Sequence, residues 1–477
     1  MQPDQSMLTD RDTVNLAKSY NSKYLHWDRL QYHECGRYGR ENLWYLMKLL
    51  REISCHRVNI GDLSMSFNIP ERLQQPLHSI DLTLSKEYNP VMSFNGKKKT
   101  MISVSSMMEE SIASSQIEGA ATTTKDAKRM LRDRRNPMNR SERMILNNYN
   151  AMEFIRSNLD RELTPDLIKE LHSVISNDTL ESKEYEGKFR TDNSVAVRDV
   201  ITGETYHEPV SHELIVPMVD ELCDFVNSDE EYIHPMIKGI LIHYIVAYIH
   251  PFMDGNGRVS RSLFYWYTMK HGYSFMEYIS ISKAINEHKG RYEEAYQLCE
   301  TDGNDVTYFI DYNIDMIMLS VEMLTKYLNN KQDERRAVRD LIDSDDLSQR
   351  RMDIINCLIN SDSAMTVYEL SSELGVSPQT IRNDIAVLIQ RGYAKESSKS
   401  GHRKRFSYSG NATNAEHPVS CRTIRTHKNK RTIPYSEDHD ERLDLREIRR
   451  EHRSEIERDQ GIGRQVGVQE GYVGHVF

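Results

Sequence analysis

The spacing of apolar residues predicts a mainly α-helical chain. Apolar positions recur every three or four residues along several stretches, which predicts helices, at residues 41–53, 107–119, 143–156, 212–227, 234–249 and 257–271. Thr164 before Pro165 has the sequence of an N-cap and a first-turn proline, which predicts one more helix ending near Asn177.

Strand patterns are few. Residues 57–68 alternate between apolar and polar positions, as a half-buried strand does. Thr202 and Gly203 separate two short runs, 194–197 and 204–207, which predicts a β-hairpin. The basic run at residues 96–100 is interpreted as a loop.

These patterns divide the chain into five parts. We expect an accessory region over 1–100 and a helical domain over 101–330, which includes the helix at 107–119. A charged helical connector is expected over 331–350. A compact winged helix-turn-helix follows over 351–410. The last part, 411–477, is polar and rich in alternating charges, which predicts a solvated helix or disorder.

Composition narrows the class of protein. A net charge of −10 argues against nucleic-acid binding over the whole surface. A local basic patch that binds nucleic acid is still compatible with this net charge. The six cysteines are scattered singly, which favours free thiols in a reducing compartment. The polar N-terminus is unlike a signal peptide, and the longest apolar run, 237–249, is too short to span a bilayer. We therefore expect a cytoplasmic protein without a membrane span.

The loop after the most apolar helix carries the main candidate chemistry. His250 is suited to accept a proton as a general base, and Asp254 is a hard oxygen ligand for Mg²⁺. Glycines on both sides of Asn256 let backbone N–H groups turn toward one anion at the start of the next helix. Two arginines three residues apart can hold phosphate oxygens. We assign to a nucleotide's phosphates the residues Gly255, Asn256, Gly257, Arg258, Val259, Ser260 and Arg261.

This string, from His250 to Arg261, resembles the signature HPFx[DE]GNGRxxR of the Fic family at every fixed position. The resemblance covers residues of about 101–320 and implies a Fic-type helical core. It implies transfer of AMP from ATP, with Mg²⁺, to a Ser, Thr or Tyr hydroxyl of a target protein. It also makes residues 187–190 and the hairpin at 195–206 a flap that holds the target, and it implies nucleotide contacts at Val195 and His288. The family often has asparagine at the position of His288, so an exposed helix residue is the alternative interpretation there.

A second motif lies upstream. Residues 114–119 are similar to the family's inhibitory motif [ST]xxxE[GN], with Ser114 and Glu118 four apart on one helix face. In the family this glutamate pairs with the second arginine of the loop, here Arg261. Arg261 cannot hold a carboxylate and the γ-phosphate of ATP together, so the motif implies autoinhibition. In some members the same glutamate orients a water that removes AMP, and the sequence does not separate the two roles.

The segment after residue 365 predicts DNA contacts. Gly375 permits a sharp turn, Ser377 caps the next helix, and that helix resembles the recognition helix of bacterial winged-helix regulators. The candidate contacts lie on this helix and on the wing, at Gln379, Thr380, Arg382, Asn383, Arg403, Lys404 and Arg405. Winged helices also mediate dimers and other protein contacts, and that alternative stays open.

Three functional hypotheses follow. The first is a protein adenylyltransferase restrained by Glu118. The second is a transcription regulator whose Fic domain senses nucleotide or modifies the protein itself. The third is an enzyme of this kind that removes AMP or that transfers another group, UMP, phosphocholine or phosphate, although the intact Gly257, Arg258 and Arg261 favour AMP. The sequence leaves open the target, the signal that relieves Glu118, and the oligomeric state, a homodimer included.

Overall fold

The computed structural model describes residues 4–84, 96–198, 205–343, 347–361, 364–400 and 403–409. This part of the chain is mainly α-helical, as predicted, with three small antiparallel sheets. It divides into two compact units, of which the first ends at Leu328 and the second begins at Asn329. None of the described helices is long and apolar enough to cross a membrane. The predicted tail, 411–477, lies outside the described residues.

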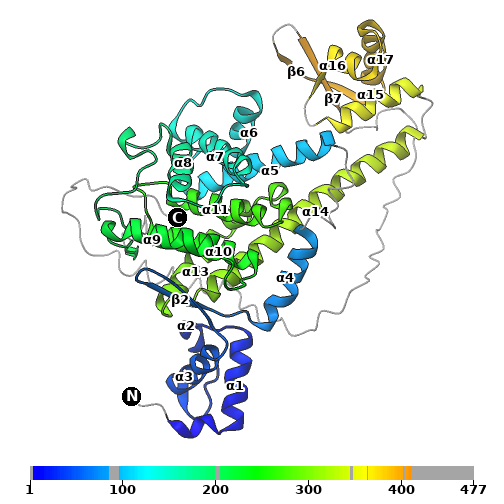
Figure 1. The fold of residues 1–477 in the computed structure, drawn as a ribbon. Helices are drawn as coiled ribbons and strands as arrows, with labels where there is room; N and C mark the ends of the chain where they lie inside the picture. The colour runs from blue at the N-terminus through cyan, green and yellow to red at the C-terminus, as the bar shows by residue number, and fades with distance from the viewer. Residues whose placement is uncertain are drawn as a thin grey trace, which may run out of the picture. The chain divides into compact units, whose positions relative to one another are not determined.

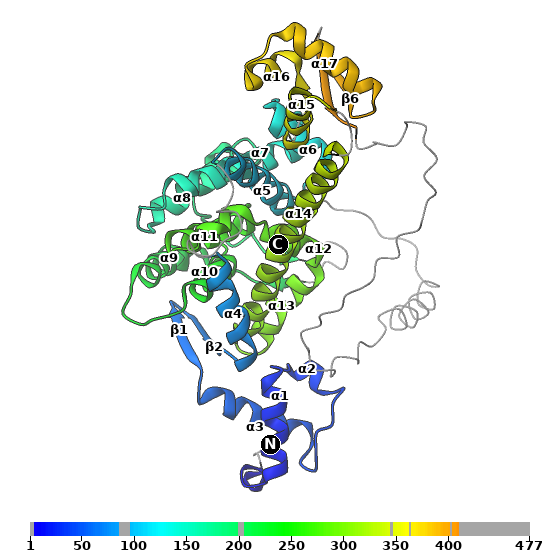
Figure 2. The same ribbon diagram turned by 90° about the vertical axis from the view of Figure 1, so that its right-hand side faces the viewer.

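The first unit is built around α10 (Pro235–Ile249), which is apolar on every side and buried over almost its whole length. A helix of that kind belongs inside a core, and α11 (Asn256–Lys270) packs along it (Figures 1 and 2). The other helices of this core are α5 (Gly96–Ile117), α6 (Thr124–Asp133), α7 (Arg140–Ser157), α8 (Pro165–Ser176), α9 (His212–Asn227), α12 (Ile281–Glu287), α13 (Lys289–Thr301) and α14 (Thr307–Asp343), with short 3₁₀ turns η3 (Lys183–Tyr185) and η4 (Ser274–Tyr278).

The structure confirms the predicted helix after Thr164 and the predicted hairpin. Thr164 caps α8, since its hydroxyl accepts from the backbone N–H of Leu167 at 3.1 Å, with Pro165 in the first turn. The predicted hairpin is present as β3 (Val197–Arg198) paired with β4 (Thr205–His207). Its predicted turn, with Thr202 and Gly203, lies outside the described residues.

The prediction for the basic run is wrong. Residues 96–100, expected to be a loop, form the first turn of α5. Lysine has a good helix propensity, and a basic run is as compatible with a helix start as with a loop. The boundary expected after residue 330 is close to Asn329, where the second unit begins, but α14 runs through it to Asp343 as one helix.

A small helical module precedes this core in the chain. It contains the 3₁₀ turn η1 (Gln5–Leu8) and the helices α1 (Arg11–Ser22), α2 (Trp27–Leu30) and α3 (Gly39–Glu52). The helix predicted at 41–53 is confirmed by α3, which buries its apolar face against α1. The strand pattern at 57–68 is a hairpin of β1 (His56–Ile60) and β2 (Leu63–Phe67), followed by α4 (Glu71–Leu84).

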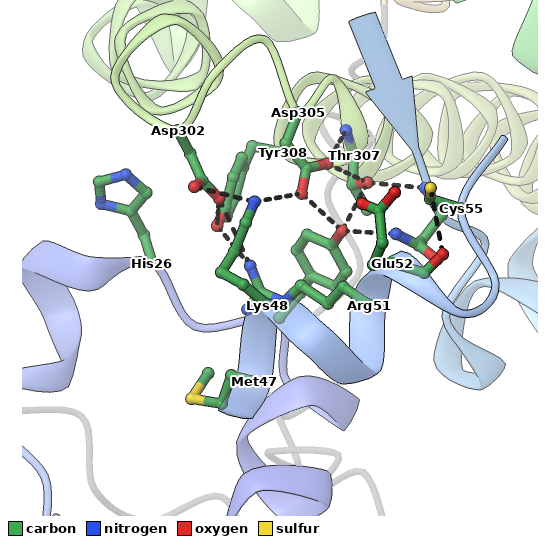
Figure 3. Close-up of polar contacts among 12 residues, drawn as sticks. His26, Met47, Lys48, Arg51, Glu52, Cys55, Asp302, Asp305, Thr307 and Tyr308 are labelled. Atoms are coloured by element: carbon green, nitrogen blue, oxygen red, sulfur yellow. Dashed lines mark hydrogen bonds and ion pairs between the residues drawn. The ribbon is translucent and has the colours of Figure 1, made fainter. Parts of the chain in front are cut away.

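Buried polar contacts join this module to the core (Figure 3). The Arg51 guanidinium, only 3% exposed, donates to the Tyr308 hydroxyl at 2.8 Å and lies 3.5 Å from the Asp302 carboxylate. Lys48 lies 2.9 Å from Asp302 and 3.5 Å from Asp305. Because a buried charge that loses its partner is costly, these contacts fix the module against the turn between α13 and α14.

The second unit is a three-helix domain with a small sheet. Its elements are α15 (Gln349–Asn360), β5 (Met365–Thr366), α16 (Val367–Leu374), α17 (Pro378–Gln390), β6 (Ala394–Ser400) and β7 (Arg403–Tyr408), with strand order β5-β7-β6. Gly375 ends α16 with φ +64°, and the Ser377 hydroxyl caps α17. Ile381, Ile385 and Leu388 are buried, as predicted. This is the winged helix-turn-helix expected from the sequence.

Candidate active site

The predicted loop joins the end of α10 to the start of α11. His250 ends α10 in the left-handed conformation, with φ +51°, and its Nδ1 lies 3.2 Å from the Ala247 carbonyl. A carbonyl only accepts, so Nδ1 carries the ring proton and Nε2 is the basic atom. Gly255, with φ +90°, begins α11 in a conformation that favours glycine.

Side chains brace this loop from inside and from outside. Asn256 accepts from the Phe252 N–H and donates to the Phe252 carbonyl, both at 2.8 Å, so its amide closes the loop rather than facing outward. His172 of α8 stacks on Phe252 with ring centres 3.7 Å apart. Its Nδ1 accepts from the Gly187 N–H at 3.0 Å, so its Nε2 donates to the Asp254 carbonyl at 2.9 Å. Burial lowers the pKa of His172 to about 4, which keeps this neutral arrangement.

Arg190 holds the other end of the loop. Its side-chain Nε donates to the His250 carbonyl at 2.9 Å. Its backbone N–H donates to the Pro251 carbonyl, also at 2.9 Å. Arg190 is buried, and its Nη1 donates to the Asp192 carbonyl at 2.8 Å, so the guanidinium is itself held in place. The loop is therefore fixed from the segment that precedes the hairpin.

The imidazole of His250 is kept neutral by its surroundings. Burial first, and then the neighbouring charges of His207 and Arg190, lower the pKa of His250 to about 3. The ring is therefore unprotonated at neutral pH, which is the state that a general base requires.

The carboxylate of Asp254 lies at the surface of the loop and is held by two arginines. Arg258 Nη2 lies 3.2 Å from Asp254 Oδ1, and Arg140 Nη2 lies 3.0 Å from Asp254 Oδ2. The carboxylate is 30% exposed and is a hard oxygen donor, so it fits one Mg²⁺ ligand. Among the described residues no group of three His, Cys, Asp or Glu side chains is placed to hold a metal.

The two loop arginines are both buried in α11. Arg258 is fully buried, with Nη1 3.5 Å from the Ile175 carbonyl. Arg261 is 3% exposed and points to α5, where it donates through Nε to the Ser114 hydroxyl and through Nη2 to the Ser114 carbonyl, each at 3.0 Å.

Glu118 completes the partners of Arg261. Its Oε1 accepts from Arg261 Nη2 at 2.9 Å, and the carboxylate is only 6% exposed. Burial lowers the pKa of Arg261, but the Glu118 carboxylate, together with Tyr292, raises it, and the net shift is upward. The sequence motif at 114–119 and the loop therefore meet in one buried ion pair.

The end of α5 is itself fixed on the core. Lys289 donates to the Ile117 carbonyl at 3.0 Å, and the Ser106 hydroxyl donates to the Tyr278 carbonyl at 2.6 Å. The buried Glu110 carboxylate accepts from the Tyr265 hydroxyl at 2.8 Å and from the Ser282 N–H at 2.9 Å. These bonds place Glu118 over the start of α11.

Gly257 leaves the space that Glu118 fills. A Cβ on Gly257 would lie 2.2 Å from Glu118 Oε1 and 3.1 Å from Arg261 Nη1. We expect Gly257→Ala to push the carboxylate away and to destabilise the protein by about 1–3 kcal/mol. Thermal unfolding measures this.

The control for that prediction is the same change without the carboxylate. In a Glu118→Gly background most of the contact that Gly257→Ala creates is absent, so the loss of stability should shrink. An equal loss in both backgrounds would contradict the close approach of Glu118 to Gly257.

The other predicted nucleotide contacts, Val259, Ser260, Val195 and His288, differ in how exposed they are to solvent. Val259 and Ser260 are buried within the packing of α11, and the Ser260 hydroxyl donates to the Gly257 carbonyl at 2.8 Å. Val195 is partly exposed just before β3. His288 lies between α12 and α13, with Nδ1 3.1 Å from the Ala284 carbonyl.

The predicted DNA contacts lie in the second unit. Gln379, Arg382 and Asn383 are exposed on the first turns of α17, and Thr380 beside them is partly exposed. Arg403 begins β7. Lys404 pairs with Glu396 at 2.9 Å, and Arg405 donates to the Ala364 carbonyl at 3.0 Å, so these two side chains already have partners within the unit.

Several residues of the loop's surroundings were not identified from the sequence as site residues. Arg140 and His172 reach the loop from α7 and α8, more than 80 positions away in the chain. Arg190 lies in the segment that the resemblance assigned to the flap, which was the one available signal.

Known families and proteins are similar to parts of this chain. Residues 162–268 match the Fic/DOC family, and residues 350–403 match an HTH domain. Protein adenylyltransferase Fic from Drosophila willistoni is 34% identical over 128 residues, which is 26% of this chain and 23% of that protein. Protein adenylyltransferase Fic from Nematostella vectensis is 32% identical over 129 residues, which is 26% of this chain and 27% of that protein.

The match thus spans about a quarter of the length of these relatives. A crystal structure of a Fic family protein from Desulfovibrio desulfuricans G20 is 16% identical, with a TM-score of 0.47 over 71% of this chain and 95% of that one. The region that matches the Fic/DOC family holds the loop at His250, and the region that matches an HTH domain lies in the second unit.

Proposed function

We propose that this protein transfers AMP from ATP to a hydroxyl group of a target protein. The observation that carries the proposal is the Arg261–Glu118 pair at the start of α11, because it joins two separate Fic motifs in one site. The similarity to proteins named protein adenylyltransferase supports the same activity.

In this proposal the target hydroxyl attacks the α-phosphorus of ATP and pyrophosphate leaves. His250 Nε2 accepts the hydroxyl proton, since Nδ1 faces the Ala247 carbonyl. The start of α11 offers backbone N–H groups and a favourable dipole to the phosphates. Arg261, once released from Glu118, supplies a planar guanidinium to the γ-phosphate.

Asp254 would hold Mg²⁺ together with the phosphate oxygens, and the ion would neutralise the charge of the leaving group. Its carboxylate would have to exchange at least one of its contacts with Arg140 and Arg258. Both arginines would then lie beside the polyphosphate.

Glu118 is the restraint in this proposal. Arg261 is buried with a carboxylate 2.9 Å away, so an ATP γ-phosphate has to displace that carboxylate before it binds the same guanidinium. The resting protein is therefore the inhibited form.

The function is tested by intact-mass measurement of the Glu118→Gly protein after incubation with ATP and Mg²⁺. An added adenylyl mass on the protein itself, or on proteins of a cell lysate, is the expected result. Absence of any adenylyl group in both samples would contradict the proposed reaction.

The cysteines bear on the compartment in which the protein works. Cys35, Cys55, Cys223, Cys299 and Cys357 are free thiols, which supports a reducing compartment and hence our proposal of the cytoplasm.

A second function, DNA binding, is supported by the exposed face of α17. Gln379, Arg382 and Asn383 lie on the first turns of a helix that follows a helix-turn-helix corner, where such proteins read the major groove. The Fic domain would then act at, or report to, a DNA site.

Replacing Arg382 by alanine should weaken specific DNA binding, with a cost of about 1–3 kcal/mol for a direct base contact. A gel-shift assay with genomic fragments measures this. Lys395→Ala, which removes an exposed lysine of β6, is the control for a phosphate contact, and should weaken binding to all sequences alike. Equal binding by the Arg382 variant and the wild type would contradict groove reading and leave protein contact as the role of this unit.

A further inference from the structure

His207, at the end of flap strand β4, touches two other elements of the core. Its Nε2 lies 2.8 Å from the Tyr248 carbonyl of α10, and its Nδ1 lies 2.7 Å from Glu300 Oε1 of α13. The ring is 5% exposed and packs against the Tyr248 ring, with centres 4.8 Å apart. Val197 of β3 is its partner across the hairpin.

These two contacts determine the protonation of the ring. A carbonyl oxygen and a carboxylate oxygen both accept, whereas a neutral imidazole has one donor and one acceptor nitrogen. A neutral ring would therefore direct a lone pair at an acceptor on one side. Both contacts are attractive at the same time only when each ring nitrogen carries a proton.

We propose that His207 is a positioning residue that, as an imidazolium, clasps flap strand β4 to the end of α10 and to α13. The clasp acts two residues before His250, because the Tyr248 carbonyl is its acceptor on α10. The titratable groups that face the ring are Glu300 on α13 and Tyr248 and His250 on α10. Its role in positioning a target rests on the transfer reaction proposed above, but the clasp itself does not.

The clasp has two consequences. The described strands of the flap are short, Val197–Arg198 and Thr205–His207, and a charge-assisted contact at the end of β4 adds to what holds them. The charge of His207 also contributes to the lowered pKa of His250. The proton that makes His207 an imidazolium therefore both holds strand β4 and favours the neutral form of His250.

Hydrogen exchange of the flap tests the clasp without any measurement of activity. Exchange of the backbone amides of residues 205–210, corrected for the intrinsic effect of pH, is followed in the full chain between about pH 6 and 9. In the wild type, protection should be about five- to tenfold greater at the low end of this range than at the high end. His207→Ala should lack this protection at every pH.

Glu300→Gln separates charge from hydrogen bonding. A glutamine amide donates to Nδ1 of a neutral ring, while Nε2–H still donates to the Tyr248 carbonyl, so both bonds persist. Protection in this variant should be close to that of the wild type at low pH and should not change with pH.

Two outcomes would overturn the proposal. The first is flap protection in the wild type that does not change with pH, and the second is Glu300→Gln protection as low as that of His207→Ala. In a Glu118→Gly background, self-labelling should show the same pH dependence as the exchange. Failure of the transfer reaction would remove that second readout only, so the two proposals can be told apart.

Discussion

Replacement of Glu118 by glycine should raise self-adenylylation on the order of 10- to 100-fold. The substitution removes the carboxylate that lies 2.9 Å from Arg261 Nη2 and leaves the guanidinium to the γ-phosphate of ATP. Ser114 still holds Arg261 through its hydroxyl and its carbonyl, so the arginine keeps its place in the site. Transfer is measured with ATP that carries its label on the α-phosphate.

A matched control separates this effect from a general loosening of the helix. Gln116→Gly puts the same residue into the last turn of α5 without touching Arg261, and it should leave the rate near that of the wild type. Glu118→Gln, which keeps the size of the side chain but loses its charge, should give an intermediate rate. Equal rates for the wild type and Glu118→Gly would show that the pair does not restrain the enzyme.

Replacement of His250 should lower transfer by on the order of 10²- to 10⁴-fold in the Glu118→Gly background. The imidazole is the basic group at the end of α10, and its lowered pKa keeps it neutral over the physiological range. His250→Ala removes the base, and His250→Asn does so with a residue that tolerates the left-handed backbone at this position.

The two substitutions control each other. Transfer should be lost in both the His250→Ala and the His250→Asn protein, while the unfolding temperature of His250→Asn stays closer to that of the parent protein. The missing basic imidazole, and not a loss of stability, then accounts for the lower rate. A His250→Asn protein that retains a rate within about threefold of its parent would exclude His250 as the general base.

Local signals in the sequence were sufficient for much of the fold. Caps such as Thr164 and Ser377, and the turn at Gly375, depend on residues close in sequence, and the structure has each of them where the pattern predicted it. The loop from His250 to Arg261 was also readable, because its residues are contiguous.

Contacts between residues far apart in the sequence could not be predicted from local patterns. Arg140, His172 and His207 reach the loop or its helix from separate elements, and no local pattern marks them. The pairing of Arg261 with Glu118 was predicted only because a family motif connects them. The start of α5 was missed because a glycine followed by lysines is compatible with both a loop and a helix.

A double-mutant cycle tests most directly whether Glu118 and ATP compete for Arg261. Transfer rates are measured for the wild type, Glu118→Gly, Arg261→Ala and the double variant under one set of conditions. We predict that Glu118→Gly raises the rate on the order of 10- to 100-fold when Arg261 is present and by no more than about twofold when it is absent. An equal gain in both backgrounds would contradict the competition for Arg261.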